Sequence, residues 1–315
     1  MSLLLHRSRM AGCLALALGL ISTSVARAGL LFITNTTGNT IGEYTDSGVP
    51  VNPSLITGLH GPVGIAISGS NLFVANSGNG TIGEYTTSGA AVNAALISGI
   101  SGPVGIALSG SNLFVASGGS GNGKIGEYDA TTGTPINAAL ITGLSAPYGV
   151  AVSGSELYLT NGGTSQAGGF NLSPLTLNLL ISGLDLPDGI AQSGSNLFVA
   201  NACSGIPGPT CGMGTIGEYD ATTGVPINAA LVSGLSWPVG IALSGSHLFV
   251  ANSTGNTIGE YDAITGAPIN AALITGLNNP QGIAILSAVP EPSGLALLST
   301  ALLGIGIARC RSRFT

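Results

Sequence analysis

The side chains with the clearest chemical potential are acidic residues that recur in a G-E-Y motif. Two carboxylates held close together can act as general acid and base or bind a metal ion. Here each carboxylate belongs to a separate copy of one motif, so we expect the copies to be spread apart, each with a structural role. The motif supplies Glu43, Glu84, Glu127, Glu218 and Glu260, followed by Tyr44, Tyr85, Tyr128, Tyr219 and Tyr261.

A second set of candidates follows the proline of a P-x-G-[I/V]-A motif. The variable residue is Val63, Val104, Tyr148, Asp188, Val239 and Gln281 in turn. An enzyme site should bring several titratable groups together, and this set has a single Asp. We interpret Tyr148, Asp188 and Gln281, with Trp237 just before the fifth proline, as a candidate ligand-binding patch; scattered loop variation is the alternative. The sequence indicates no catalytic residue, no metal ligand set and no cofactor.

The cysteines and histidines offer little further chemistry. Cys203 and Cys211 bracket S-G-I-P-G-P-T, and in an exported protein such a close pair predicts a disulfide. A zinc site would need more ligands than this part of the chain provides. His60 and His247 stand alone and do not form a Ser-His-Asp constellation.

A repeat organises these residues. The motif [N/E/H]-L-[F/Y]-[V/L]-[A/T], with one shortened copy at the start, recurs at steps of 40–51 residues. Its aromatic positions are Phe32, Phe73, Phe114, Tyr158, Phe198 and Phe249. Short β segments repeated at this period are typical of a β-propeller blade rather than of a helical solenoid.

Each repeat contains four predicted strands and no helix. In the copy at 103–144 they are GIALS, NLFVAS, KIGEY and PINAALI, separated by Gly, Ser, Asn and Asp clusters. The first repeat lacks an inner strand, and the last inner strand, near residues 282–286, lacks partners. Pairing of the two chain ends would complete one blade and remove the exposed edges of an open array. The sequence therefore predicts an all-β, six-bladed propeller of four-stranded antiparallel blades, closed by its N- and C-terminal strands.

Small and large residues alternate along the inner strands, which predicts blades that interlock face to face. On this basis we expect nearly all apolar positions to lie in the core of one domain, residues 29–288. That body contains twelve acidic residues and one basic residue, Lys124, for a net charge near −11 (1 − 12). Nucleic-acid affinity depends on Lys and Arg neutralising phosphates, so this composition excludes a nucleic-acid partner.

The N-terminal segment, residues 1–28, predicts a secretory signal peptide. Arg7 and Arg9 precede an apolar run at 10–21, and Ala26-Arg27-Ala28 forms a small-x-small cleavage site. We expect cleavage between Ala28 and Gly29.

The C-terminal segment, residues 289–315, has three parts: Pro290-Glu291-Pro292, a hydrophobic segment at 294–308, and a basic end with Arg309, Arg311 and Arg313. This order resembles the PEP-CTERM sorting signal of exported proteins. The resemblance implies an exosortase-type processing enzyme as partner and transient insertion in the inner membrane. The final location would be the cell surface or the extracellular space, commonly beside exopolysaccharide.

The body is similar to NHL/YVTN-type propellers through the stretch LFVANSGNGTIGEY at 72–85. Those families are functionally diverse, so the resemblance implies a fold and not an activity. Two hypotheses stay open. One is a non-enzymatic surface or extracellular-matrix propeller that binds a protein or polysaccharide; the other is a metal-dependent, lactonase-like or lyase-like propeller enzyme. The valines of the variable set favour the first.

Overall fold

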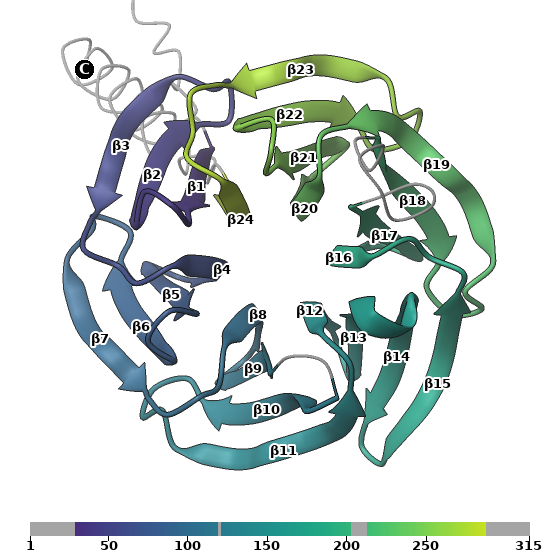
Figure 1. Cartoon of the computed structure of the whole chain (residues 1–315), viewed down its shortest axis with the longest axis horizontal. Helices are drawn as coiled ribbons and strands as arrows, with labels where there is room; N and C mark the ends of the chain where they lie inside the picture. The colour runs from purple at the N-terminus through teal and green to yellow at the C-terminus, as the bar shows by residue number, and fades with distance from the viewer. Residues whose placement is uncertain (1–28, 119–120, 203–212, 288–315) are drawn as a thin grey trace, which may run out of the picture. The chain divides into compact units, whose positions relative to one another are not determined.

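The computed structural model describes residues 29–118, 121–202 and 213–287, and this part of the chain forms six four-stranded antiparallel sheets arranged in a ring (Figure 1). The predicted six-bladed propeller is confirmed. Blade one contains β24 (Pro280–Leu286), β1 (Leu30–Asn35), β2 (Thr40–Thr45) and β3 (Pro50–Ile56), in order from the axis to the rim.

The other blades follow the chain without crossovers. Blade two is β4 (Pro62–Ser68), β5 (Asn71–Asn76), β6 (Thr81–Thr86) and β7 (Ala91–Ile97); blade three is β8 (Pro103–Ser109), β9 (Asn112–Ser117), β10 (Gly123–Asp129) and β11 (Pro135–Leu144). Blade four is β12 (Pro147–Ser153), β13 (Glu156–Asn161), β14 (Gln166–Leu172) and β15 (Leu175–Ser182). Blade five is β16 (Pro187–Ser193), β17 (Asn196–Asn201), β18 (Gly214–Asp220) and β19 (Pro226–Leu235); blade six is β20 (Pro238–Ser244), β21 (His247–Asn252), β22 (Thr257–Asp262) and β23 (Pro268–Ile274).

The ring closes where the two ends of the body meet. β24 pairs antiparallel with β1, with Leu31 opposite Ile285 and Phe32 opposite Ala284. Beside this seam the amide of Gly29 donates a hydrogen bond to Asp46 Oδ2 at 2.9 Å, and the amide of Asp46 donates to the carbonyl of Gly29. β24, the last strand of the body, therefore completes blade one by pairing with the first strand, as predicted.

The inner strands approach one another so closely that the motif glycine is required. A Cβ on Gly64 would lie 2.1 Å from the carbonyl oxygen of Val104, and one on Gly105 would lie 1.9 Å from that of Tyr148. These are contacts with the backbone of the next blade, which has no side-chain rotamer to adjust. The P-x-G motif is thus a packing requirement around the axis.

The core lies between blades rather than within any one of them. Each of six apolar clusters draws on two neighbouring blades; one joins Phe198 and Ile216 of blade five to Leu248 and Val250 of blade six. The phenylalanines of the second strands are among the most deeply buried side chains. Interlocking of neighbouring sheets therefore holds the ring together, as the alternation of small and large residues predicted.

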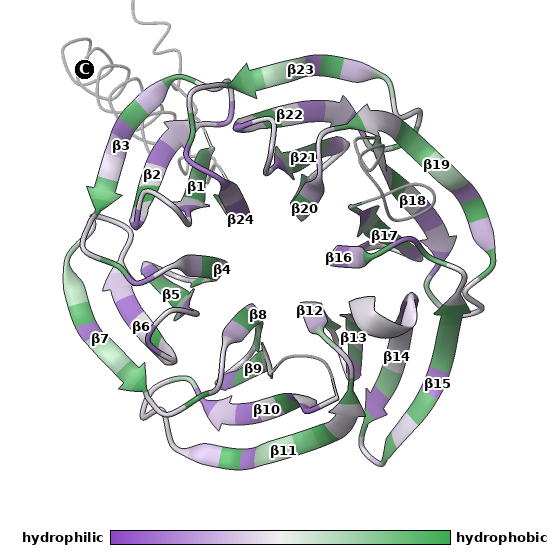
Figure 2. Ribbon diagram, viewed as in Figure 1, coloured by the Kyte–Doolittle hydropathy of each residue, from purple (hydrophilic) through white to green (hydrophobic). Residues whose placement is uncertain are grey.

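The expectation that nearly all apolar positions are buried is wrong at the rim. The aliphatic residue that precedes Asn in each outer strand is 51–55% exposed: Val51, Val92, Ile136, Leu177, Ile227 and Ile269. Hydrophobic residues run along the outer strands in Figure 2. The physical reason is that radially arranged sheets diverge away from the axis, so that outer strands have no neighbouring blade to cover them.

The sequence predicted no helix, and the described residues contain one 3-10 turn, Gly162–Thr164 in blade four. Among these residues no helix is long and apolar enough to span a membrane. Several predictions fall outside the described residues and remain predictions. They are the signal peptide with Ala28, the disulfide of Cys203 and Cys211, and the tail with Pro290, Glu291, Pro292 and the segment 294–308.

Candidate functional site

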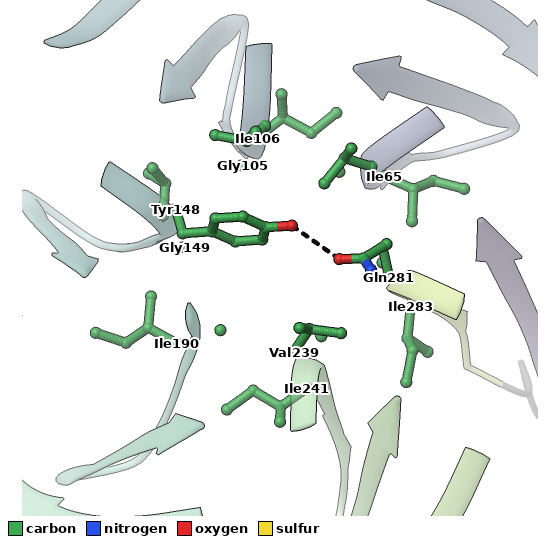
Figure 3. Close-up of a pocket in the computed structure, with 17 residues that line it drawn as sticks. Ile65, Gly105, Ile106, Tyr148, Gly149, Ile190, Val239, Ile241, Gln281 and Ile283 are labelled. Atoms are coloured by element: carbon green, nitrogen blue, oxygen red, sulfur yellow. Dashed lines mark hydrogen bonds between the residues drawn. The ribbon is translucent and has the colours of Figure 1, made fainter. Parts of the chain in front are cut away.

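The six inner strands all begin with proline at the same face of the ring, here called the proline face, and the variable residue follows at the mouth of the axis. Below it the axis holds a cavity of about 90 Å³, lined mainly by the motif glycines and by aliphatic side chains such as Ile65, Ile106 and Val239 (Figure 3). Pockets for organic ligands are usually about 300–1,000 Å³. The axial cavity therefore has room for a few water molecules and not for a sugar or lactone.

Tyr148 and Gln281 meet across this cavity. The Tyr148 side chain extends across the pocket from blade four, and its hydroxyl donates to Gln281 Oε1 of blade one at 2.8 Å (Figure 3). Gln281 is held in turn, because its Nε2 donates to Ser253 Oγ and to Asn279 Oδ1, each at 3.0 Å. Burial raises the pKa of the Tyr148 phenol, so at neutral pH this hydroxyl stays a hydrogen-bond donor.

Asp188 is the charged member of the patch. Its backbone carbonyl accepts a hydrogen bond from Thr160 Oγ1 at 2.5 Å, which joins blade five to blade four. Burial raises the pKa of the Asp188 carboxyl to about 7, since the low-dielectric surroundings disfavour the charged form. The carboxylate charge also contributes to the raised pKa of Tyr148. Asp188 and Tyr148 are therefore electrostatically coupled, and Asp188 changes charge near neutral pH.

Trp237, the fourth predicted member, lies in the loop that leads into β20. Its ring packs against the cluster that contains Val239 and Phe249, and its carbonyl accepts a hydrogen bond from the amide of Ser253. The structure thus joins Tyr148 to Gln281 and couples Asp188 to Tyr148. It places Trp237 on the same face, with its ring packed against the cluster of Val239 and Phe249.

The residue before each inner-strand proline has a left-handed backbone. The φ angles are 59° at Gly61, 53° at Gly102, 49° at Ala146, 46° at Leu186, 55° at Trp237 and 55° at Asn279. Glycine adopts this conformation freely, whereas other L-residues pay roughly 1–2 kcal/mol. Blades two and three use glycine, and the remaining four blades carry a strained side chain at the proline face.

The carboxylates of the G-E-Y motif lie toward the opposite face, and those of blades two, three, five and six are bonded within their own blades. Glu84, Glu127 and Glu218 each accept a hydrogen bond at 2.6–2.7 Å from the first residue of the neighbouring strand, Asn71, Asn112 and Asn196 respectively. In blade six His247 Nδ1 lies 2.6 Å from Glu260 Oε1. These contacts agree with the structural role expected for the series.

Blade four replaces this carboxylate by a different one. Gly169 occupies the Glu position opposite Tyr158, and Glu156 stands where blade three has Asn112. Glu156 accepts hydrogen bonds from the Tyr158 hydroxyl and from Asn178 Nδ2. Sequence reasoning missed this substitute, for which the signal was a lone Glu at the start of a second strand.

No three His, Cys, Asp or Glu side chains come close enough to hold a metal ion within residues 29–118, 121–202 and 213–287. A second, larger cavity of about 350 Å³ lies between blades five and six. It is bordered by Ser193, Asn196, Glu218, Ser246 and Ile264. Its single carboxylate already accepts the hydrogen bond from Asn196.

Comparison with known proteins identifies the fold. No family model matches the sequence, and no curated protein matches it. A chain in a crystal structure of a nidogen/laminin complex is similar, with a TM-score of 0.66 and 15% sequence identity, covering 84% of this chain and 100% of that one. At this identity the likeness shows a shared six-bladed β-propeller fold and nothing about activity.

Proposed function

We propose that this protein is an exported, non-enzymatic binding or scaffold propeller of the cell surface or extracellular matrix. In this proposal the PEP-CTERM-like tail delivers it, and the proline face around Tyr148, Asp188, Gln281 and Trp237 binds a surface polysaccharide or protein. The propeller itself is shown by the structure. Export, sorting and the ligand are the proposed parts.

The observation that carries the binding role is the narrow axis. Propeller enzymes need a central pocket that admits substrate and surrounds it with titratable groups. Here the axial cavity of about 90 Å³ is mainly aliphatic and lies under the Tyr148–Gln281 hydrogen bond. What the proline face offers instead is the half-buried side chains of Tyr148, Asp188 and Trp237, which suit hydrogen bonding and stacking with a surface ligand.

The strained loop residues support the same face. Left-handed, non-glycine residues tend to cluster where function maintains them, and Leu186 and Trp237 hold this conformation next to Asp188 and Val239. The similar solved chain comes from a complex of two proteins, and we infer by analogy alone that this ring can also serve as a platform for binding.

The binding role is tested with polysaccharide from the producing host and the full-length protein. Replacing Tyr148 and Asp188 together by Ala should weaken binding at least about tenfold, because a hydrogen-bonding face loses two groups. Val104→Ala, at the equivalent position of blade three, is the matched control and should leave binding unchanged. Equal binding by all three proteins would contradict the assigned face.

The enzymatic alternative has its own readout. A ligand that binds only the folded state raises the melting temperature, so calcium is added to the purified protein and thermal unfolding is recorded. We expect no shift beyond that produced by magnesium. A large, calcium-specific rise would favour the metal-dependent enzyme over the scaffold.

Sorting is tested in the producing host. Replacing Pro290, Glu291 and Pro292 by Ala should leave the propeller folded but retain the full-length chain in the inner membrane, since the tail would no longer be processed. Mature wild-type protein that still carries Arg309 to Thr315 would overturn the sorting proposal in favour of a plain membrane anchor.

A further inference from the structure

The outer strand of blade four, β15, differs from every other strand at the rim. It pairs with β14 at seven positions and its register is interrupted once. The other outer strands pair at three to five positions and are interrupted two or three times. β15 is therefore the most continuous outer strand, and its other edge pairs with no strand in the part of the chain that the structure describes.

β15 also presents an apolar face. Leu180, Leu177 and Leu175 lie opposite Gly168, Phe170 and Leu172 respectively, and alternate residues of β14 share one face of the sheet. The three leucines therefore share that face as well. They are 55%, 55% and 40% exposed, whereas each of the other outer strands has one large aliphatic side chain that is this exposed.

The other five outer strands carry protection that β15 lacks. In each of them an Asn side chain at the bulge accepts a hydrogen bond at 3.1–3.3 Å from the backbone amide two residues later, as Asn137 does from Ala139. Four of the five also begin with proline. In β15 the equivalent Asn178 is directed to Glu156 and Asn171 instead. Bulges, prolines and charges are the usual means of blocking an exposed edge, and β15 has one bulge, no proline and no charge.

We propose that β15 is a self-association site, at which it pairs antiparallel with β15 of a second copy of this chain. An unpaired strand edge presents a row of backbone donors and acceptors that a partner strand with a free edge can fill. Two identical antiparallel edges are complementary about a twofold axis. No charged residue occurs between Glu156 and Asp185, so β15 itself carries no charge to attract a charged partner, while a second copy supplies matching leucines. The dimer would contain one continuous eight-stranded sheet.

This proposal is independent of the ligand-binding role and is tested by analytical ultracentrifugation of the full chain in a mild detergent over a wide concentration range. Wild-type protein should show a concentration-dependent monomer–dimer equilibrium. Leu177→Lys should weaken dimerisation at least about tenfold, because each dimer carries the buried charge twice and exposed edges are blocked by Lys.

The matched control is Ile136→Lys, the equivalent residue of blade three, with 54% exposure against 55% for Leu177. It should change dimerisation less than about twofold, since the bulged β11 is not the pairing edge. Hydrogen exchange locates the interface. The amides of residues 175–182 should become protected from exchange as the protein concentration rises, and those of residues 226–235 should not. A monomer at all concentrations, equal effects of the two variants, or protection at both rims would overturn the proposal.

Discussion

Blades three and four are neighbours built from the same repeat, yet they diverge from the third strand outward. Blade three keeps Glu127 and Tyr128, and then a turn in which Asp129 Oδ1 accepts bonds from Thr131, Thr132 and the Thr132 hydroxyl. Blade four has QAGGFNL, a two-residue turn and a leucine-rich outer strand. Their inner strands keep the same P-x-G geometry. The comparison teaches that the ring constrains the strands near its axis and leaves the rim free to change.

The largest effect should come from the constrained part. Gly105→Ala in blade three would place a Cβ 1.9 Å from the Tyr148 carbonyl oxygen, whereas Gly149→Ala in blade four would place one 2.5 Å from that of Asp188. Because the obstacle is backbone, we expect Gly105→Ala to lower the free energy of unfolding by about 3 kcal/mol or more, and Gly149→Ala by less. Urea denaturation measures both. Equal or negligible losses would mean that the inner strands separate easily.

The second prediction restores the repeat in the divergent blade. Gly169→Glu rebuilds the motif Glu of blade four, but its Cβ would lie 2.9 Å from Leu179 Cβ, and its carboxylate would join Glu156 beside Tyr158. Crowding and like charge should cost about 2–3 kcal/mol. Glu127→Gly in blade three is the reciprocal change and should cost about 1–2 kcal/mol through the lost bond to Asn112. A Gly169→Glu protein more stable than wild type would show that the packing of blade four has not adapted to the loss of the motif Glu.

The third prediction concerns pH. The Asp188 pKa rises from its ordinary value of about 4 to about 7 on folding, so the folded state binds more protons between these values and its stability falls as the pH rises through them. Asp188→Asn removes this loss. We expect the variant to match wild type near pH 4 and to be more stable by about 2 kcal/mol near pH 8, a value discounted for the partial exposure of the group. Thermal unfolding at both pH values measures it, and parallel pH profiles would contradict the assignment.

The smallest effect should come from the residue before the inner-strand proline, which is Gly102 in blade three and Ala146 in blade four. Ala146→Gly in blade four should stabilise by less than about 1 kcal/mol, because relief of left-handed strain is partly offset by the flexibility of glycine when unfolded. Gly102→Ala in blade three should destabilise by about 1 kcal/mol, since the only atom near a new Cβ is Ser77 Oγ at 3.9 Å. Chemical denaturation of the two variants measures the change in the free energy of unfolding for each. If both variants were stabilised, or both destabilised, the strain argument would be refuted.

The fold could be predicted in full because the repeat fixes strand order, and counting inner strands fixes closure. The candidate patch could be predicted only as a set of positions. That Tyr148 reaches Gln281 depends on the diameter of the ring, which the glycine contacts set and which no local pattern encodes. The exposed aliphatic ring was mispredicted for a similar reason, since P-I-N-A-A-L-I has the same composition whether or not a neighbouring blade covers it.

The hydrogen bond between Gly29 and Asp46 ties the start of β1 to the end of β2, next to the strand pairing that closes the ring. If the chain is cut at the predicted position, the amide of Gly29 becomes an ammonium group that already lies beside a carboxylate oxygen. The hydrogen bond from a neutral amide would then become an ion pair, and any other residue at 29 would place its Cβ 2.8 Å from that oxygen. Under the signal-peptide proposal, removal of the leader would in this way be a covalent step that strengthens the link between β1 and β2 beside the seam of the ring.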